Sequence, residues 1–138
     1  MAEAGTKVRN ETYSSAVLAS IYELGRLYYE TGYFAPAERI FSGLAAVDNG
    51  QTPARLGLGV IKLERGLFPD STAQFRLALQ GNLQPIRAKL GLTASFIAQG
   101  DFARARAVLA ELEREPAFAQ AENAELKVLL ETLIARVG

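Results

Sequence analysis

The chain of 138 residues contains no cysteine, no histidine and no tryptophan. Without cysteine it can form neither a disulfide nor a thiolate metal site, and it suits a reducing compartment. Without histidine it lacks the side chain used most often for acid–base catalysis and metal ligation near neutral pH. The glycines of the LGLG segment at 56–59 fall inside a predicted helix, not in a phosphate-binding loop after a strand. We therefore expect no enzyme activity, no metal site and no cofactor.

Charge of one sign and long apolar runs are also missing. Fifteen basic and fifteen acidic residues cancel, so the whole surface does not attract nucleic acid or an anionic membrane. No run approaches the roughly 18 apolar residues of a membrane span, and the N-terminal stretch MAEAGTKVRNETYSS lacks the apolar core of a secretory signal. These absences predict a cytoplasmic protein that neither binds nucleic acid nor inserts into a membrane.

What the sequence does contain is an internal repeat. Glycine recurs every 34 residues at Gly32, Gly66 and Gly100, and each glycine is followed two residues later by phenylalanine. This period is typical of stacked helical hairpins, and 34 residues is the length of the tetratricopeptide unit. Three further columns repeat at the same interval: Leu24, Leu58 and Leu92; Ala37, Ser71 and Ala105; and Phe41, Phe75 and Leu109.

Glycine and proline divide the chain into seven predicted helices. All five prolines fall where a helix should begin or end, because proline fits the first turn of a helix and not its interior. The three repeated glycines fall at the turn inside each helix pair, where a left-handed backbone is needed. We predict an all-α fold of three antiparallel pairs and one terminal helix. The predicted spans are about 14–31, 35–47, 53–65, 69–80, 85–99, 102–114 and 119–136.

The predicted domain organisation is a short N-terminal arm at 1–13 and a single domain at 14–138. The repeats within this domain are expected at about 18–51, 52–85 and 86–118, followed by the helix at 119–136. That last helix either caps the open end of the array, as such arrays require, or binds a partner. Its apolar face is formed by Leu126, Leu129, Leu130, Leu133, Ile134 and Val137.

The apolar spacing also predicts which faces meet in the first pair. We expect small residues at Gly25 and Ala37 to let the two helix backbones approach closely, since glycine inside a helix otherwise costs about 1 kcal/mol relative to alanine. The predicted contact joins Ile21, Leu24, Gly25 and Tyr28 to Ala37, Ile40, Phe41 and Leu44.

On these residues the chain resembles the tetratricopeptide family. The family pattern has a large residue, a leucine-glycine pair, an aromatic residue, a turn glycine and then small and aromatic residues. In the second unit, Lys62 replaces the aromatic residue and Ser71 replaces alanine. The first unit matches the pattern with Ile21, Leu24, Gly25, Tyr28, Gly32, Ala37, Phe41 and Leu44, and the third matches it with Leu92, Phe96, Gly100, Ala105, Leu109 and Leu112.

A narrower resemblance covers about residues 21–134. The stretches GYFAPAERIFSGLAAVD and ARLGLGVIKLERGLFPDSTAQF look like the first and second repeats of the tetratricopeptide chaperones of bacterial type III secretion, which hold translocator proteins before export. The related needle-subunit chaperones fit the same residues. The resemblance implies a cytoplasmic bacterial chaperone that keeps a secretion substrate soluble and unassembled. A general tetratricopeptide adaptor that joins components of a complex is the alternative.

In such arrays the first helix of every pair lines a concave groove. Most of the residues at these positions are apolar or aromatic, so the groove is expected to bind an apolar segment of a client protein. Coverage of the same stripe by the terminal helix, by residues 1–12 or by the second subunit of a homodimer is the other possibility. The predicted groove residues are Tyr22, Arg26, Tyr29, Leu56, Val60, Leu63, Leu90, Ala94 and Ile97.

Overall fold

The computed structural model describes residues 13–81, 83–118 and 124–137, and within these ranges it contains seven helices and no strand. The predicted all-α class is confirmed, and the first six helices agree with their predicted spans to within one residue at each end. The predicted start of the last helix at 119 and residues 1–12 of the predicted arm lie outside the described residues. The helices are α2 (Ser15–Glu30), α3 (Phe34–Val47), α4 (Ala54–Glu64), α5 (Phe68–Gly81), α6 (Pro85–Gln99), α7 (Phe102–Glu113) and α8 (Ala124–Val137).

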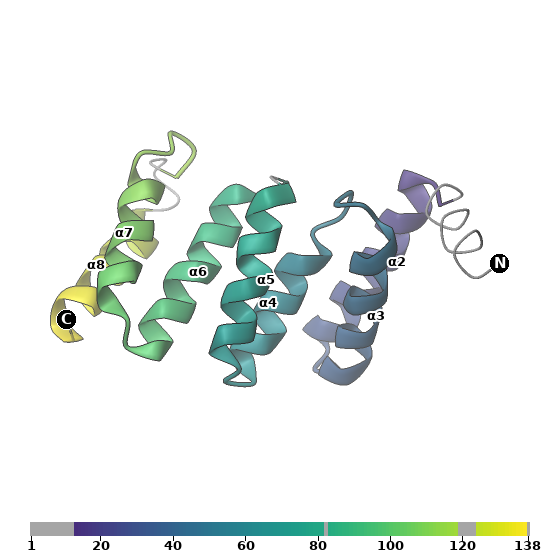
Figure 1. The fold of residues 1–138 in the computed structure, drawn as a ribbon, viewed down its shortest axis with the longest axis horizontal. Coiled ribbons are helices and arrows are strands. Elements are labelled where there is room, and N and C mark those ends of the chain that lie inside the picture. The colour runs from purple at the N-terminus through teal and green to yellow at the C-terminus, as the bar shows by residue number, and fades with distance from the viewer. Residues whose placement is uncertain (1–12, 82, 119–123, 138) are drawn as a thin grey trace.

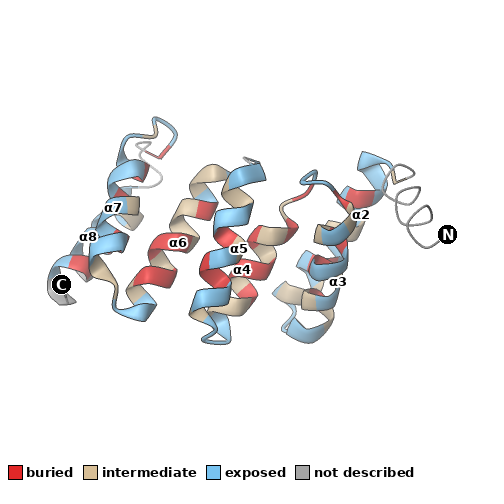
Figure 2. Ribbon diagram, in the orientation of Figure 1, coloured by how far each residue is buried: buried red, intermediate tan, exposed pale blue. Residues whose placement is uncertain are grey.

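The helices stand in a row, with α2 and α3 at one end and α7 and α8 at the other (Figure 1). Each helix packs on its neighbour along the chain, from α2 on α3 to α7 on α8, and α4 also contacts α6. Buried residues line the inner sides of the helices, and exposed residues cover the outside (Figure 2). The buried hydrophobic residues form two core clusters, one around α2, α3 and α4 and the other from α4 to α8.

Side-chain caps and proline fix where several helices begin. The Ser14 hydroxyl accepts a hydrogen bond from the backbone N–H of Val17 at the start of α2. The Asp101 carboxylate does the same for Arg104 at the start of α7. Pro85 occupies the first position of α6, where its missing N–H has no partner to lose.

The three turns inside the helix pairs close in the same way. Gly32, Gly66 and Gly100 have φ values of 89°, 77° and 77°, which glycine adopts without strain. In each turn the residue after the glycine donates its N–H to the carbonyl five residues earlier, at 2.8–2.9 Å. This is the Schellman pattern of helix termination. A β-carbon at any of these glycines would meet no atom within 4 Å, so the turn requires glycine for its backbone and not for space.

Two phenylalanine rings lie at the contacts between successive helix pairs, which we call joints. Phe41 of α3 is buried against Gly25 of α2 and Gly57 of α4, and a β-carbon at either glycine would lie 2.6 Å from the ring. Phe75 of α5 has the same relation to α4 and α6. A β-carbon at Gly59 would lie 2.6 Å from its ring, and one at Gly91 would lie closer still. Glycine at these helical positions therefore makes room for an aromatic ring of the neighbouring helix.

The structure corrects two predictions about the first pair. The space at Gly25 is filled by the ring of Phe41 and by the Ile40 side chain, not by the backbone at Ala37. Leu24 is not part of the core cluster around α2 and α3. It is 46% exposed, whereas Leu58 and Leu92, one and two periods later, are each 5% exposed. Both later leucines belong to clusters that include the preceding pair. Within the described residues no pair precedes α2, so Leu24 has nothing to cover it.

The second unit departs from the repeat at Ser71, and the departure is accommodated by hydrogen bonds. The buried Ser71 hydroxyl donates to the carbonyl of Phe68 at 3.0 Å and lies 2.7 Å from the Ser95 hydroxyl of α6. Ser95 in turn lies 2.9 Å from the hydroxyl of Thr72. The joint between α5 and α6 thus contains a buried cluster of three hydroxyl groups, which we call the hydroxyl cluster (Ser71, Thr72 and Ser95).

Lys62, the other departure in the second unit, forms an ion pair between units. Its ammonium group lies 3.0 Å from the carboxylate of Glu38 on α3. Arg65 approaches the same carboxylate at 3.0 Å. The lysine therefore replaces an aromatic contact with a charged link between α3 and α4.

Candidate protein-binding groove

Five of the nine predicted groove residues come together around one pocket. This pocket has a volume of about 220 Å³ and lies between α2, α4 and the beginning of α6. We call it the groove pocket. The predicted residues that line it are Tyr22, Arg26, Tyr29, Leu56 and Val60, and the other lining residues are Glu30, Phe41, Gly57 and Arg87.

The remaining predicted residues lie outside the groove pocket. Leu63, Leu90, Ala94 and Ile97 are half-buried, and Leu90 and Ile97 pack against the C-terminal core cluster. Leu56 lines the pocket but is only 7% exposed and belongs to that core cluster. The predicted stripe therefore serves partly as core, and its open portion is concentrated between the first and second helix pairs.

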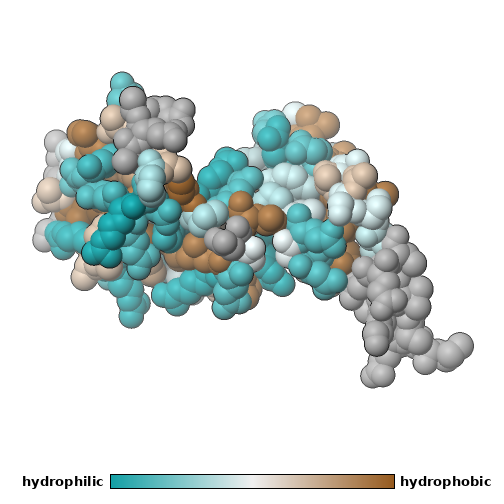
Figure 3. Space-filling view, turned by 90° about the horizontal axis from the view of Figure 1, so that it is seen from above, coloured by the Kyte–Doolittle hydropathy of each residue, from teal (hydrophilic) through white to brown (hydrophobic). Residues whose placement is uncertain are grey.

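The hydropathy of the surface agrees with a local site. On the face shown in Figure 3, hydrophobic residues form separate patches that are divided by hydrophilic residues. Exposed apolar side chains occur at the two ends of the row and in its middle: Val17, Leu24 and Leu27 on α2, Val128 and Leu129 on α8, and Leu67, Leu77 and Leu83 in or beside α5.

The groove pocket is apolar where Phe41 and Val60 line it. The ring of Tyr22 lies 5.6 Å from that of Phe41 between centroids, at an interplanar angle of 35°. Gly57 adds no side chain and allows the Phe41 ring to approach α4. The same glycine that permits the joint between the pairs thus helps to shape the pocket.

Tyr29 forms a fixed wall between α2 and α4. Its hydroxyl donates a hydrogen bond to the carboxylate of Glu64, and its ring lies 5.4 Å from that of Phe34. Burial raises the pKa of Tyr29 to about 12, and the hydrogen bond and negative charge of Glu64 act in the same direction. The hydroxyl therefore stays protonated and continues to donate at all physiological pH values.

Tyr22 lies near two positive charges. Burial raises the pKa of its hydroxyl, while the positive charges of Arg87 and Arg26 act in the opposite direction. Arg26 belongs to the predicted groove, and it is paired on α2 with Glu23 at 3.5 Å and with Glu30 at 3.3 Å. Arg87 was not predicted. It precedes Leu90 by three residues, so helical spacing from that groove position could have identified it.

A second pocket, of about 320 Å³, lies between the α3–α4 and α5–α6 connections. Its buried carboxylate is Asp48, which accepts hydrogen bonds from the N–H of Gly50 at 2.9 Å and of Thr52 at 3.3 Å, and from the Thr52 hydroxyl. These bonds hold the connection in shape and use the carboxylate oxygens. We therefore assign this pocket to the structure of the loop.

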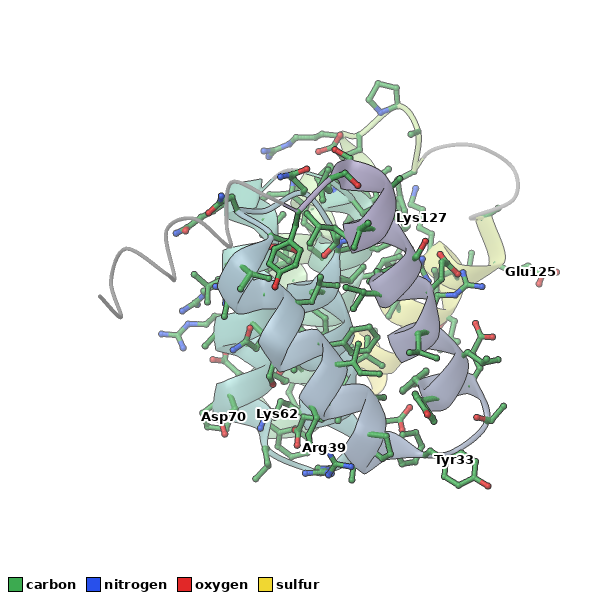
Figure 4. The ribbon with its side chains drawn as sticks, turned by 90° about the vertical axis from the view of Figure 1, so that its right-hand side faces the viewer. Tyr33, Arg39, Lys62, Asp70, Glu125 and Lys127 are labelled. Carbon is green, nitrogen blue, oxygen red and sulfur yellow. The ribbon has the colours of Figure 1, made fainter. Side chains whose placement is uncertain are left out.

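Tyr33, Arg39, Lys62 and Asp70 lie along the edge of the row that carries the turns inside the helix pairs (Figure 4). None of these four residues lines the groove pocket. Within the described ranges, no three carboxylates come close enough together to hold a metal ion. None of the helices placed there has both the length and the apolar content that crossing a membrane requires.

Comparison of the chain with protein-family models, with curated proteins and with solved structures finds no significant match of any of these three kinds.

Proposed function

We propose that this chain is a chaperone that holds an apolar segment of another protein in the groove pocket and keeps that protein soluble and unassembled. The observation that carries the proposal is the groove pocket itself, where the half-buried side chains of Tyr22, Tyr29 and Val60 line an open site across two helix pairs, beside the buried ring of Phe41. Apolar surface that remains open to solvent usually marks an interaction site.

The proposal includes a tetratricopeptide-like solenoid as the architecture. Its support is the repetition of two local structures at the 34-residue interval. The glycine turns at 32, 66 and 100 use the same hydrogen bonds, and the rings of Phe41 and Phe75 meet glycines at corresponding positions. Solenoids of this kind bind extended or helical segments along the side lined by the first helices.

The size of the groove pocket favours a protein segment as the ligand. Its volume of about 220 Å³ is below the roughly 300–1,000 Å³ of a small-molecule site, and it suits one large side chain. Resemblance of the sequence to the type III secretion chaperones supplies the class of client. We propose a secretion substrate, either a translocator or a needle subunit, bound in the bacterial cytoplasm.

Co-expression with the products of neighbouring genes tests this function. The client should be insoluble when it is expressed alone and soluble when it is expressed with this chain. Val60→Glu should abolish that effect, because a charge in the apolar pocket would be desolvated by the client. Ala73→Glu on the exposed side of α5 is the matched control and should behave like the wild type.

Two results would overturn the proposal. A client that is soluble alone and still binds would indicate an adaptor, and a folded Val60→Glu variant that still rescues the client would place binding elsewhere. Because Val60 also packs against the core, circular dichroism and thermal melting of each variant must accompany the solubility assay. If Val60→Glu unfolds, Tyr22→Glu replaces it, since Tyr22 lies on the opposite wall of the pocket.

A further inference from the structure

Arg87 lines the groove pocket without an ionic partner among the described residues. Its guanidinium donates to the side-chain oxygen of Gln84 at 3.4 Å, and no described carboxylate lies within 4.0 Å of it. Arg87 also lies in the first turn of α6, where the helix dipole disfavours a positive charge. Neither an ion pair nor the dipole therefore explains a positive charge at this position.

Arg87 is one of the residues that line the groove pocket, together with Tyr22. Its positive charge opposes the rise that burial causes in the pKa of the Tyr22 hydroxyl. Arg26 is also near, but its charge is balanced by Glu23 and Glu30. Arg87 is thus the positive charge at this site that is free to pair with a ligand.

The carboxylates near the site already have partners. Glu30 lines the groove pocket and pairs with Arg26 at 3.3 Å. Glu64, at the end of α4, accepts the hydrogen bond from the Tyr29 hydroxyl. Neither carboxylate neutralises Arg87, which lies in the first turn of α6.

We infer that the groove pocket recognises a protein segment in which a carboxylate side chain lies beside one large apolar side chain. The apolar side chain packs on the half-buried side chains of Tyr22 and Val60, and the carboxylate pairs with Arg87. This inference rests on the proposed function and specifies the chemistry of the client. Arginine can bind a carboxylate through two parallel hydrogen bonds.

Selection from a random peptide library on the full-length protein tests the inference. Retained peptides should share an aspartate or glutamate near a leucine or aromatic residue. The same selection on Arg87→Glu should favour lysine or arginine at that position. Arg39→Glu is the matched control, because Arg39 is an exposed arginine of α3 that does not line the groove pocket (Figure 4).

Synthetic peptides that differ only at the acidic position then measure the contribution of the pair. Replacement of aspartate by asparagine should weaken binding to the wild type about ten-fold, between the values typical of exposed and of buried charge pairs. Replacement by lysine should restore binding to Arg87→Glu. Arg87 is exposed, so its variants should fold, and thermal melting provides the check.

The outcomes separate this inference from the proposed function. Peptides that share an apolar residue but no acidic one, with equal affinity for wild type and Arg87→Glu, would overturn the carboxylate site and leave groove binding intact. Failure of the wild type to retain any peptide above the bare support would overturn both. An acidic preference that persists in Arg87→Glu would show that another cation binds the carboxylate, and it would also overturn the inference.

Discussion

The joints at Phe41 and Phe75 are filled by an aromatic ring, whereas the corresponding joint at Leu109 is not. Leu109 is buried, but an open pocket of about 250 Å³ lies beside it, lined in part by Arg106, Glu113 and Ile134. Thr93 stands where the first two units have Gly25 and Gly59, and Glu125 stands where α4 and α6 have Gly57 and Gly91. Where the ring is absent, both glycines that would accommodate it are absent too.

This comparison indicates that a ring and its two glycines act as one packing unit. The joint at Phe75 is close-packed, because the ring is fully buried, so a change in side-chain volume there must strain the helices. The joint at Phe41 adjoins the groove pocket. The outer joint between α7 and α8 has spare volume, and its hydrogen bond from Arg106 to the carbonyl of Ile134 is long, at 3.5 Å. Equivalent substitutions should therefore have larger effects at the Phe75 joint than at the outer one.

Removal of a ring should have the largest effect. Phe75→Ala should lower the free energy of unfolding by about 3–5 kcal/mol, because it leaves a cavity in a fully buried site. Leu109→Ala should cost about 2–3 kcal/mol, near the low end for leucine, since the adjoining pocket is already open. Urea denaturation of both variants measures the difference. Equal losses would contradict the distinction between inner and outer joints.

Addition of one methyl group at a joint glycine should have the next largest effect. Gly91→Ala should destabilise the protein by about 1–3 kcal/mol, because the new methyl group would overlap the buried ring of Phe75. Gly43→Ala is the control, since Gly43 lies in α3 with no atom within 4 Å of its β-carbon position. That control should stabilise the protein by up to about 1 kcal/mol through helix propensity alone.

A double mutant sharpens this result. If the ring is the obstacle, Gly91→Ala should cost much less in a Phe75→Leu background than in the wild type, so that the two substitutions are not additive. Additive losses in a thermodynamic cycle would show that the backbone, and not the ring, rejects the methyl group.

The hydroxyl cluster should contribute less than a ring. Ser95→Ala should lower stability by about 1–2 kcal/mol, because Ser95 bridges the hydroxyls of Ser71 and Thr72 in the joint between α5 and α6. Ser42→Ala on the exposed side of α3 should be neutral or slightly stabilising. The melting temperatures of the two variants, each compared with the wild type, test this expectation. Shifts of similar size would show that the hydroxyl cluster does not stabilise the protein more than an exposed serine does.

The smallest effect should be a pH dependence at the outer joint. Partial desolvation beside α8 raises the pKa of Glu113 above 4.5, the neighbouring carboxyl group of Glu131 raises it further, and the positive charge of Lys127 opposes the rise. The folded protein therefore binds this proton more tightly than the unfolded chain does. Its contribution to stability is complete below pH 4.5 and is lost as the pH rises through the raised pKa.

Glu113→Gln tests that contribution. The melting temperature of the wild type relative to this variant should fall as the pH is raised from about 4 to 7. Glu125→Gln on the exposed surface of α8 (Figure 4) removes a charge of the same sign and serves as the control. A difference between wild type and Glu113→Gln that stays constant over this range would show that folding does not raise the pKa of Glu113.

The helices and their turns could be predicted because they depend on local chemistry. Glycine at 32, 66 and 100 supplies positive φ, and proline marks the helix starts, so both signals act within a few residues. The exposure of Leu24 could not be predicted from the repeat, because the repeat specifies a face and not whether a neighbour covers it. Leu27 is 57% exposed and Ile61, one period later, is 1% exposed for the same reason.

The groove pocket could be predicted only in part. Helical spacing identified Tyr22, Arg26, Tyr29 and Val60, because they repeat the positions of one helix face. It missed Arg87, whose long side chain reaches the pocket from the next helix pair. It also assigned Leu56 to the groove, although most of that side chain is in the core. Contacts between units depend on side-chain length and on helix tilt, which the repeat interval does not specify.

The arrangement of rings and glycines also determines how this chain could become longer. Residues 52–85 carry Gly57, which accepts a ring from the preceding unit, and Phe75, which needs a glycine in the following one. A tandem duplication of this segment would place Phe75 of the first copy against Gly57 of the second, so the new joint would already have its ring and its glycine. The hydroxyl groups of Ser71 and Thr72 would then face Ile61 in place of Ser95, and Ile61→Ser in the second copy would restore their partner. A longer groove is therefore one duplication and one substitution away.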